Sequence, residues 1–192
     1  MDNNIIIDYY DNYIASQLKS GINDRIYNLY KQLIRAGLTK NSSVLEMGCG
    51  IGAMSYLLAR KVKNGKIESF DFSPESIKIA QSRIQQKNVR FFIADAVEYT
   101  PQNKIFDFIT LFDLIEHIPI ERHCALFKNL SNIATENTLI LINIPNPASL
   151  TFDNLNNPEQ LQIVDQPVPL NLLVNNLLAN NLELIFFESH SV

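Results

Sequence analysis

Apolar residues follow two kinds of spacing along this chain. Short runs that are apolar almost throughout predict strands, and stretches with apolar residues three and four positions apart predict helices. The predicted strands cover residues 43–47, 66–71, 88–96, 104–112, 138–144 and 182–188, and the predicted helices cover residues 5–20, 22–36, 51–62, 74–84, 119–133 and 169–179. Buried strands that alternate with helices are typical of a doubly wound α/β fold with a mostly parallel sheet.

A glycine-rich turn follows the first predicted strand. Gly48, Gly50 and Gly52 stand at alternate positions, directly before a helix. Glycine allows a positive φ angle and a close approach of a ligand to the backbone, and the helix begins with unpaired N–H groups. The turn therefore predicts a site for a nucleotide-type cofactor, which we expect to contact Glu46, Gly48, Cys49, Gly50 and Gly52.

Two classes of cofactor fit this turn. The spacing Gly48-x-Gly50-x-x-Ala53 matches the dinucleotide fingerprint G-x-G-x-x-G/A. Glu46, however, stands two residues before the first glycine, where a carboxylate opposes the two negative charges of a pyrophosphate. S-adenosylmethionine (SAM) brings an ammonium and a sulfonium, so Glu46 favours SAM. An ordinary glycine turn with a solvated Glu46 is the simpler alternative.

Two stretches resemble the class I SAM-dependent methyltransferases. The string VLEMGCGIG at residues 44–52 resembles their motif I, E/D-x-G-x-G-x-G, and FDFI at residues 106–109 followed by EHIP at 116–119 resembles their fourth-strand region. The resemblance covers residues 43–145. It implies a Rossmann-like sheet, SAM as cofactor, and methyl transfer to a small-molecule acceptor in a biosynthetic pathway, as in ubiquinone-biosynthesis O-methyltransferases. It leaves open whether the acceptor atom is oxygen, nitrogen or carbon.

Acidic residues end the second and third predicted strands as well as the first. Asp71 lies about 20 residues after the glycine turn, where a βαβ unit places a carboxylate on the ribose hydroxyls. We expect Asp95 to accept a hydrogen bond from the adenine amino group, with Ala96 beside it. Phe72 either covers the adenine face or fills the core. Two residues at the end of the fourth strand complete the expected cofactor set, Leu111 and Phe112.

His117 follows the fourth strand and is the candidate general base for a hydroxyl acceptor, because imidazole titrates near neutral pH. Packing, or capping of the next helix, is an alternative role. Asp113, Glu116 and His117 also resemble a metal-ligand arrangement of some quinone methyltransferases, although we expect no metal. His123 and His190 have no partners in the sequence and are expected on the surface.

Composition sets the remaining bounds. The 192 residues are 46% hydrophobic and 19% charged, which suits one domain with a substantial core. The net charge of -4 argues against nucleic acid as a partner, and two cysteines without metal or disulfide spacing suit a reducing cytoplasm. The apolar run at residues 5–7 is too short to span a membrane. We expect a monomer or a homodimer.

The single domain divides into three parts. Residues 1–40 form helices that either pack on the core or act as a lid, with Tyr10 or Tyr13 reaching the cofactor carboxylate. Residues 43–145 form the cofactor-binding core, and residues 146–192 supply a substrate-side loop, a helix and the last strand. The loop, residues 145–167, is rich in proline and asparagine, and long loops at a ligand edge often shape substrate pockets.

Two other functions are alternatives to a methyltransferase. A nicotinamide-dependent oxidoreductase is disfavoured by Glu46 and Asp95 and by the lack of a Tyr-x-x-x-Lys pair. A catalytically idle SAM-binding regulatory domain has no feature against it in the sequence.

This fold normally ends with an antiparallel strand, but nothing follows the strand predicted at residues 182–188 that could form it. We therefore expect the sheet to lack that strand and the chain to be a truncated version of a longer protein.

Overall fold

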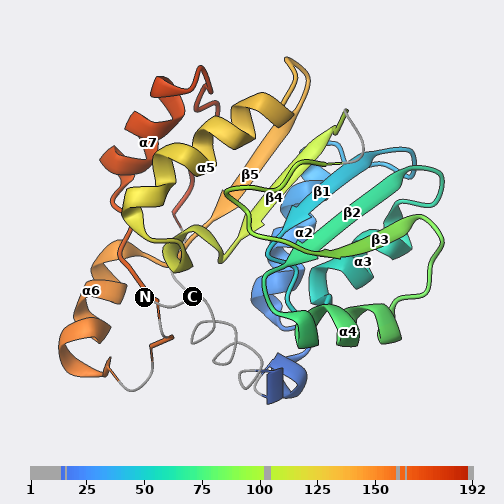
Figure 1. Ribbon diagram of the computed structural model, residues 1–192, viewed down its shortest axis with the longest axis horizontal. Helices are drawn as coiled ribbons and strands as arrows, with labels where there is room; N and C mark the ends of the chain where they lie inside the picture. Colours follow the sequence, from blue (N-terminus) through green and yellow to red (C-terminus); the bar gives the residue numbers. More distant parts are fainter. Residues whose placement is uncertain (1–13, 16, 102–104, 159–160, 163, 190–192) are drawn as a thin grey trace.

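The computed structural model describes residues 14–15, 17–101, 105–158, 161–162 and 164–189 (Figure 1). The predicted tyrosine lid and His190 lie outside the described residues. In chain order the elements are α2 (Asp24–Arg35), β1 (Ser43–Met47), α3 (Ala53–Lys61), β2 (Lys66–Asp71), α4 (Pro74–Arg83), β3 (Val89–Ile93), β4 (Phe108–Phe112), the 3₁₀ turn η1 (Ile115–His117), α5 (Ile120–Ile133), β5 (Leu139–Asn143), α6 (Pro147–Asn156) and α7 (Leu170–Ala179). No helix within these ranges is long and apolar enough to cross a membrane.

The five strands form one sheet in the order β3-β2-β1-β4-β5, and every pairing is parallel. The doubly wound α/β prediction is confirmed, and the described residues include no antiparallel last strand. The chain runs outward from β1 to β2 and β3, and then returns to β4 on the other side of β1. Because the strand order reverses between β1 and β4, their carboxyl ends mark the position at which such sheets bind ligands.

Two apolar layers enclose the sheet. On one face, α5 and α7 pack against a core that includes Phe70, Leu111 and Phe127. On the other face, α2 and α3 contribute Leu33 and Leu58, which are completely buried. With helices on both faces, a ligand can reach the sheet at the strand ends, and Figure 1 shows the chain passing from the end of β2 into α4 there.

Local sequence explains how the helices near this edge begin. The Ser73 hydroxyl accepts a hydrogen bond from the Ser76 amide at 3.0 Å, and Pro74 occupies the first turn of α4. The Asn23 side chain accepts from the Ile26 amide at 3.0 Å and caps α2 in the same way. Both helices therefore start at fixed positions beside the carboxyl ends of the strands.

The prediction of a strand at residues 182–188 was wrong. Leu182 donates its amide to Leu177 at the end of α7, and the described chain beyond it makes no ladder with β5. The side chains of Ile185 and Phe186 are 71% and 72% exposed. An apolar run becomes a strand only when a sheet edge pairs with it, and here that pairing is not made.

Two further expectations are corrected. Part of the predicted loop at residues 145–167 is helix α6, which Asn146 caps by accepting from the Ala148 amide at 2.9 Å. His123 is 1% exposed instead of lying on the surface. Its Nε2 donates to the carbonyls of Ile115 and Ile118, both at 2.9 Å, so the ring holds η1 against α5.

Candidate functional site

A cavity of about 380 Å³ lies at the carboxyl ends of the strands. Ten of the predicted site residues line it: Glu46, Gly48, Cys49, Gly50, Asp71, Phe72, Asp95, Ala96, Phe112 and His117. The other two do not. Leu111 is completely buried in the core, and Gly52 packs at the start of α3 beside Ile84.

The glycine turn bends because its glycines adopt positive φ angles. Gly48 has φ 75° and Gly50 has φ 52°. A Cβ atom at Gly48 would lie 2.9 Å from Leu114 Cδ1, so a larger residue there would displace the Leu114 side chain and strain the backbone. The amides of Gly48 and Cys49 both donate to the Phe70 carbonyl at 2.9 Å, which ties the turn to the end of β2.

Glu46 is buried beneath this turn. Its Oε2 accepts hydrogen bonds from the Ser55 hydroxyl at 2.5 Å and the Ser69 hydroxyl at 2.7 Å, and so joins β1 to α3 and β2. Burial raises the pKa of Glu46 to about 7, against the smaller opposing effect of the two hydroxyls. The carboxyl is therefore part neutral near pH 7, and a cation bound beside it would favour the ionised form.

Asp71 braces the turn from the end of β2. Its Oδ2 accepts from the Gly50 amide at 2.7 Å and its Oδ1 from the Ser73 amide at 2.9 Å. An ionised carboxylate has about four acceptor positions, so two backbone bonds leave capacity for ligand hydroxyls. Asp71 can thus shape the turn and face the cavity at once.

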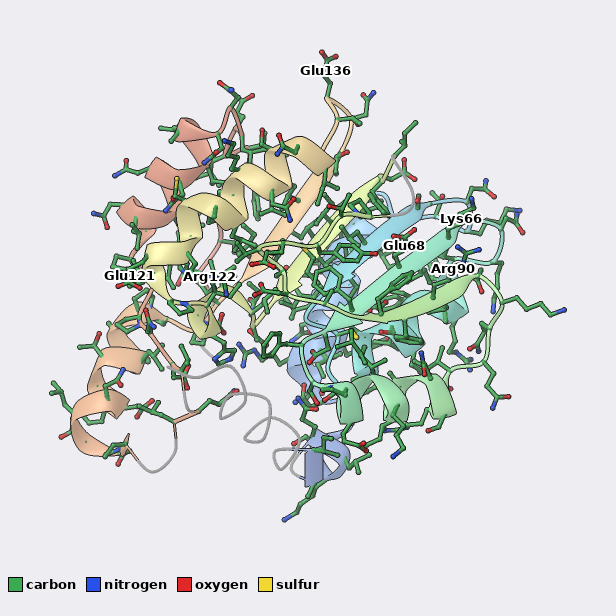
Figure 2. All side chains as sticks on the ribbon, in the orientation of Figure 1. Lys66, Glu68, Arg90, Glu121, Arg122 and Glu136 are labelled. Atoms are coloured by element: carbon green, nitrogen blue, oxygen red, sulfur yellow. The ribbon has the colours of Figure 1, made fainter. Side chains whose placement is uncertain are left out.

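Asp95 follows β3 and is held from two sides. Its Oδ1 accepts from the Val97 amide at 2.9 Å, and its Oδ2 lies 2.8 Å from Arg122 Nη2. Arg122 also lies 3.6 Å from Glu98, whose side chain is 79% exposed. Figure 2 shows Arg122 near the beginning of α5, at the end opposite Glu136. The ion pair fixes the direction of the Asp95 carboxylate at the cavity wall.

His117 lies in η1, directly after β4. Its Nδ1 is 2.6 Å from the Val164 carbonyl oxygen, which can only accept, so Nδ1 carries the hydrogen and Nε2 presents its lone pair. Asp165 Oδ1 lies 3.7 Å from the same Nδ1. Burial lowers the pKa of His117 below its usual value, although the carbonyl and the acids oppose the shift. The ring is therefore neutral near pH 7, the form that can accept a proton.

Two more acids lie near His117. Glu116 is 1% exposed, its Oε1 is 4.0 Å from His117 Nε2, and neither of its carboxyl oxygens has a hydrogen-bond partner among the described residues. Burial raises the pKa of Glu116 to about 8. Asp113, at φ 53°, accepts from Asn143 Nδ2 at 2.7 Å. The described part of the chain contains no group of three or more side chains arranged to hold a metal ion.

Comparison with known proteins agrees with this geometry. A family model described as a methyltransferase domain matches residues 22–188, which is most of the chain. The chain belongs to the class I SAM-dependent methyltransferases.

This chain is similar to methyltransferases that differ in their substrates. It is 30% identical over 96 residues to a malonyl-acyl-carrier-protein O-methyltransferase of Ilyobacter polytropus, a match that covers 50% of this chain and 33% of that protein. It is 26% identical over 133 residues to the mitochondrial ubiquinone biosynthesis O-methyltransferase of Candida albicans, covering 66% of this chain and 40% of that protein. The matches thus span well under half of these relatives' length.

A solved structure shows the same fold as this methyltransferase-family chain. It is magnesium protoporphyrin IX methyltransferase from Synechocystis PCC 6803 with bound SAH, at TM-score 0.72 and 18% identity, covering 94% of this chain and 89% of that one.

Several residues lining the cavity of this methyltransferase-family chain were not found from the sequence. Arg25 on α2 pairs with Asp113, 88 positions away, and Arg122 pairs with Asp95. Gln17, in the helical residues 17–20, also lines the cavity. Neither arginine lies in a motif, and only the packing of α2 and α5 on the sheet brings them to the site.

Proposed function

We propose that this chain binds SAM and transfers its methyl group to an oxygen or nitrogen of a small-molecule acceptor. The observation that carries the proposal is the arrangement of Glu46, Asp71 and Asp95 around the glycine turn in one cavity, with His117 on its wall. When bound, SAM supplies an electrophilic sulfonium methyl group. The residues of the chain bind, orient and exclude water.

The strand order supports an assignment of the cofactor's parts. Asp95 follows β3, Asp71 is the last residue of β2, and Glu46 lies one residue before the end of β1. These strands are neighbours in that order. A ligand with adenine at Asp95 and ribose at Asp71 would place its amino-acid end over the turn after β1. There, Glu46 is suited to a cation. Arg25 on α2, which is paired with Asp113, also lines the cavity.

His117 is suited to accept the proton of a hydroxyl acceptor. Its Nδ1–H is held by the Val164 carbonyl, and burial lowers its pKa so that the neutral form prevails at pH 7. The proton of the acceptor would move to Nε2 as the acceptor oxygen bonds to the methyl carbon and the methyl–sulfur bond breaks, with S-adenosylhomocysteine as the leaving group. Some of the similar proteins are O-methyltransferases and others are N-methyltransferases, so the proposal keeps both acceptor atoms.

Two other functions fit the site less well. A nicotinamide dinucleotide would bring its pyrophosphate to a turn that has Glu46 beneath it and Asp71 bonded to Gly50, both acidic groups. A regulatory domain that only binds SAM would need no base, whereas His117 has a defined tautomer at the cavity wall.

Calorimetric titration with SAM, S-adenosylhomocysteine, NAD and NADP tests the cofactor assignment. We expect the first two to bind and the dinucleotides not to bind. A ligand present at about 100 times its Kd should also add about 2.7 kcal/mol to the free energy of unfolding. Tight binding of NAD without SAM would overturn the proposal.

The transfer itself is tested by following labelled methyl groups from SAM into a panel of phenols, carboxylic acids and amines. Incorporation into a phenol or acid that falls in a His117→Gln variant supports the role of His117. SAM binding with no transfer to any member of the panel would favour the regulatory domain.

A further inference from the structure

Gln17 covers the glycine turn from the N-terminal side of the chain. A Cβ atom placed on Gly50 would lie 3.2 Å from Gln17 Nε2 and 3.3 Å from Gln17 Oε1, so the amide lies directly over this residue. The segment that carries Gln17 lies at the lower side of Figure 1, and Gln17 lines the same cavity as Glu46 and Asp71 at the strand ends. Gln17 therefore forms the cavity wall that faces the glycine turn.

The side-chain oxygen of Gln17 is buried and has no hydrogen-bond partner among the described residues. A buried amide oxygen without a partner costs free energy, and such groups in folded proteins usually mark a place where a missing ligand or water binds. Nearby polar groups on the same wall are already engaged. The Asn23 oxygen caps α2, and Arg25 is paired with Asp113.

We propose that the Gln17 amide binds the amino-acid end of SAM. The proposal rests on SAM being the cofactor, and it follows from the strand order, which directs that end over the turn after β1. A Cβ atom at position 50 would crowd the amide, so the glycine there, with φ 52°, leaves room for the Gln17 side chain at the cavity wall. A carboxamide both donates and accepts, so it matches a zwitterion that carries an ammonium and a carboxylate.

The competing explanation is that Gln17 only packs its helical segment onto the turn. Two ligands separate these roles. S-adenosylhomocysteine contains the amino-acid end, and 5′-methylthioadenosine lacks it but keeps adenine and ribose. A side chain that binds the amino-acid end affects the first ligand alone, whereas a structural side chain affects both.

The experiment is calorimetric titration of both ligands into the unmodified chain, Gln17→Met and Gln17→Ala. Methionine keeps the volume of the side chain but removes its hydrogen bonds. We expect each variant to bind S-adenosylhomocysteine about 10-fold more weakly and 5′-methylthioadenosine within twofold of the unmodified chain. Gln162→Ala is the matched control, because Gln162 lines the same cavity but does not lie over Gly50. It should leave the ratio of the two affinities unchanged.

An equal loss for both ligands, or no loss for S-adenosylhomocysteine, would overturn the assignment of Gln17. Thermal unfolding of each variant without ligand reports any loss of folding separately. If the unmodified chain binds neither ligand, the proposed function itself fails, and that result is visible before any variant is made.

Discussion

Asp71 has two roles, one in the backbone of the glycine turn and one at the cavity, and a single substitution tests its role in cofactor binding. Its carboxylate accepts from the Gly50 and Ser73 amides and also faces the cavity. We expect Asp71→Ala to weaken S-adenosylhomocysteine binding by roughly 1–3 kcal/mol, because charge-assisted hydrogen bonds are lost. Calorimetry measures this loss. Asp107→Ala is a control, since Asp107 also binds a strand amide, that of Ser43, but lies outside this cavity. Equal affinity of Asp71→Ala and the unmodified chain would contradict the assignment.

His117 should affect the rate and not the binding of the cofactor. His117→Gln is expected to lower kcat on a hydroxyl acceptor by about 10²–10⁴-fold, the usual contribution of a general base, with less than twofold change in S-adenosylhomocysteine affinity. Since burial lowers the pKa of His117 from 6.5, kcat/KM of the unmodified chain should rise with pH below 6.5 and level off above it.

The pH profile of the His117→Gln variant is the control for that prediction. It should lose the rise that the unmodified chain shows. A collapse of cofactor affinity in the variant would instead place His117 in the cofactor pocket or in the fold.

The acidic residues of the site could be predicted from the sequence because they lie at the ends of predicted strands. Asp71 ends β2 and Asp95 comes two residues after β3, so a parallel sheet brings them to one edge. Arg122 could not be found in this way. It reaches Asp95 only because α5 packs across the sheet, and its own surroundings in the sequence are those of an ordinary helix surface.

At the scale of elements, Gly52 joins the turn to α3 and packs against the end of α4. A Cβ atom there would lie 2.9 Å from Ile84 Cδ1 and 3.1 Å from Ala80 Cβ, and φ is 85°. We expect Gly52→Ala to lower the free energy of unfolding by about 2–4 kcal/mol, from overpacking and from backbone strain together. Urea unfolding measures the change.

Gly21→Ala is the matched control for Gly52. Gly21 also has a positive φ of 54°, but nothing lies within 4 Å of the Cβ position. This variant should therefore show only the backbone cost, about 1–2 kcal/mol. Equal losses at the two positions would show that the contacts of Gly52 with α4 are unimportant.

Most elements could be predicted because each has a local cause. The five strands are mostly apolar runs that the sheet pairs, and α4 starts at a serine followed by a proline. The segment 182–188 has the same apolar character, yet a strand also needs a partner, which periodicity does not reveal. Helix α6 was missed because Asn146 and Pro147 indicate a turn and a helix start equally well.

At the scale of the whole molecule, two buried acids make stability depend on pH. The pKa values of Glu46 and Glu116, about 7 and about 8, lie above the value of 4.5 for a free side chain. Between pH 4.5 and 8 the folded chain thus holds more protons at these sites than the unfolded chain, so this contribution to stability is lost as pH rises. Glu116→Gln should remove the share of this decline that comes from Glu116, which is on the order of 3 kcal/mol between pH 5.5 and pH 8.5.

Urea unfolding of the ligand-free chain at several pH values measures that dependence. Glu121→Gln is a suitable control, because Glu121 is an exposed acid near the start of α5 (Figure 2). If Glu116→Gln and Glu121→Gln show the same slope against pH, the carboxyl of Glu116 is not held neutral by burial.

An exposed apolar run and an open sheet edge should make the chain self-associate. Leu184, Ile185, Phe186 and Phe187 are between 42% and 72% exposed, and β5 pairs only with β4 in the described sheet. Unpaired edges and contiguous apolar surface both favour association. In sedimentation velocity, we expect the mean mass to rise with concentration, and the double variant Ile185→Lys with Phe187→Lys to suppress the rise. Phe152→Lys removes a phenylalanine of similar exposure, 59%, from α6 and should not suppress it. A constant monomer mass at every concentration, or equal suppression by Phe152→Lys, would show that residues 184–187 do not drive association.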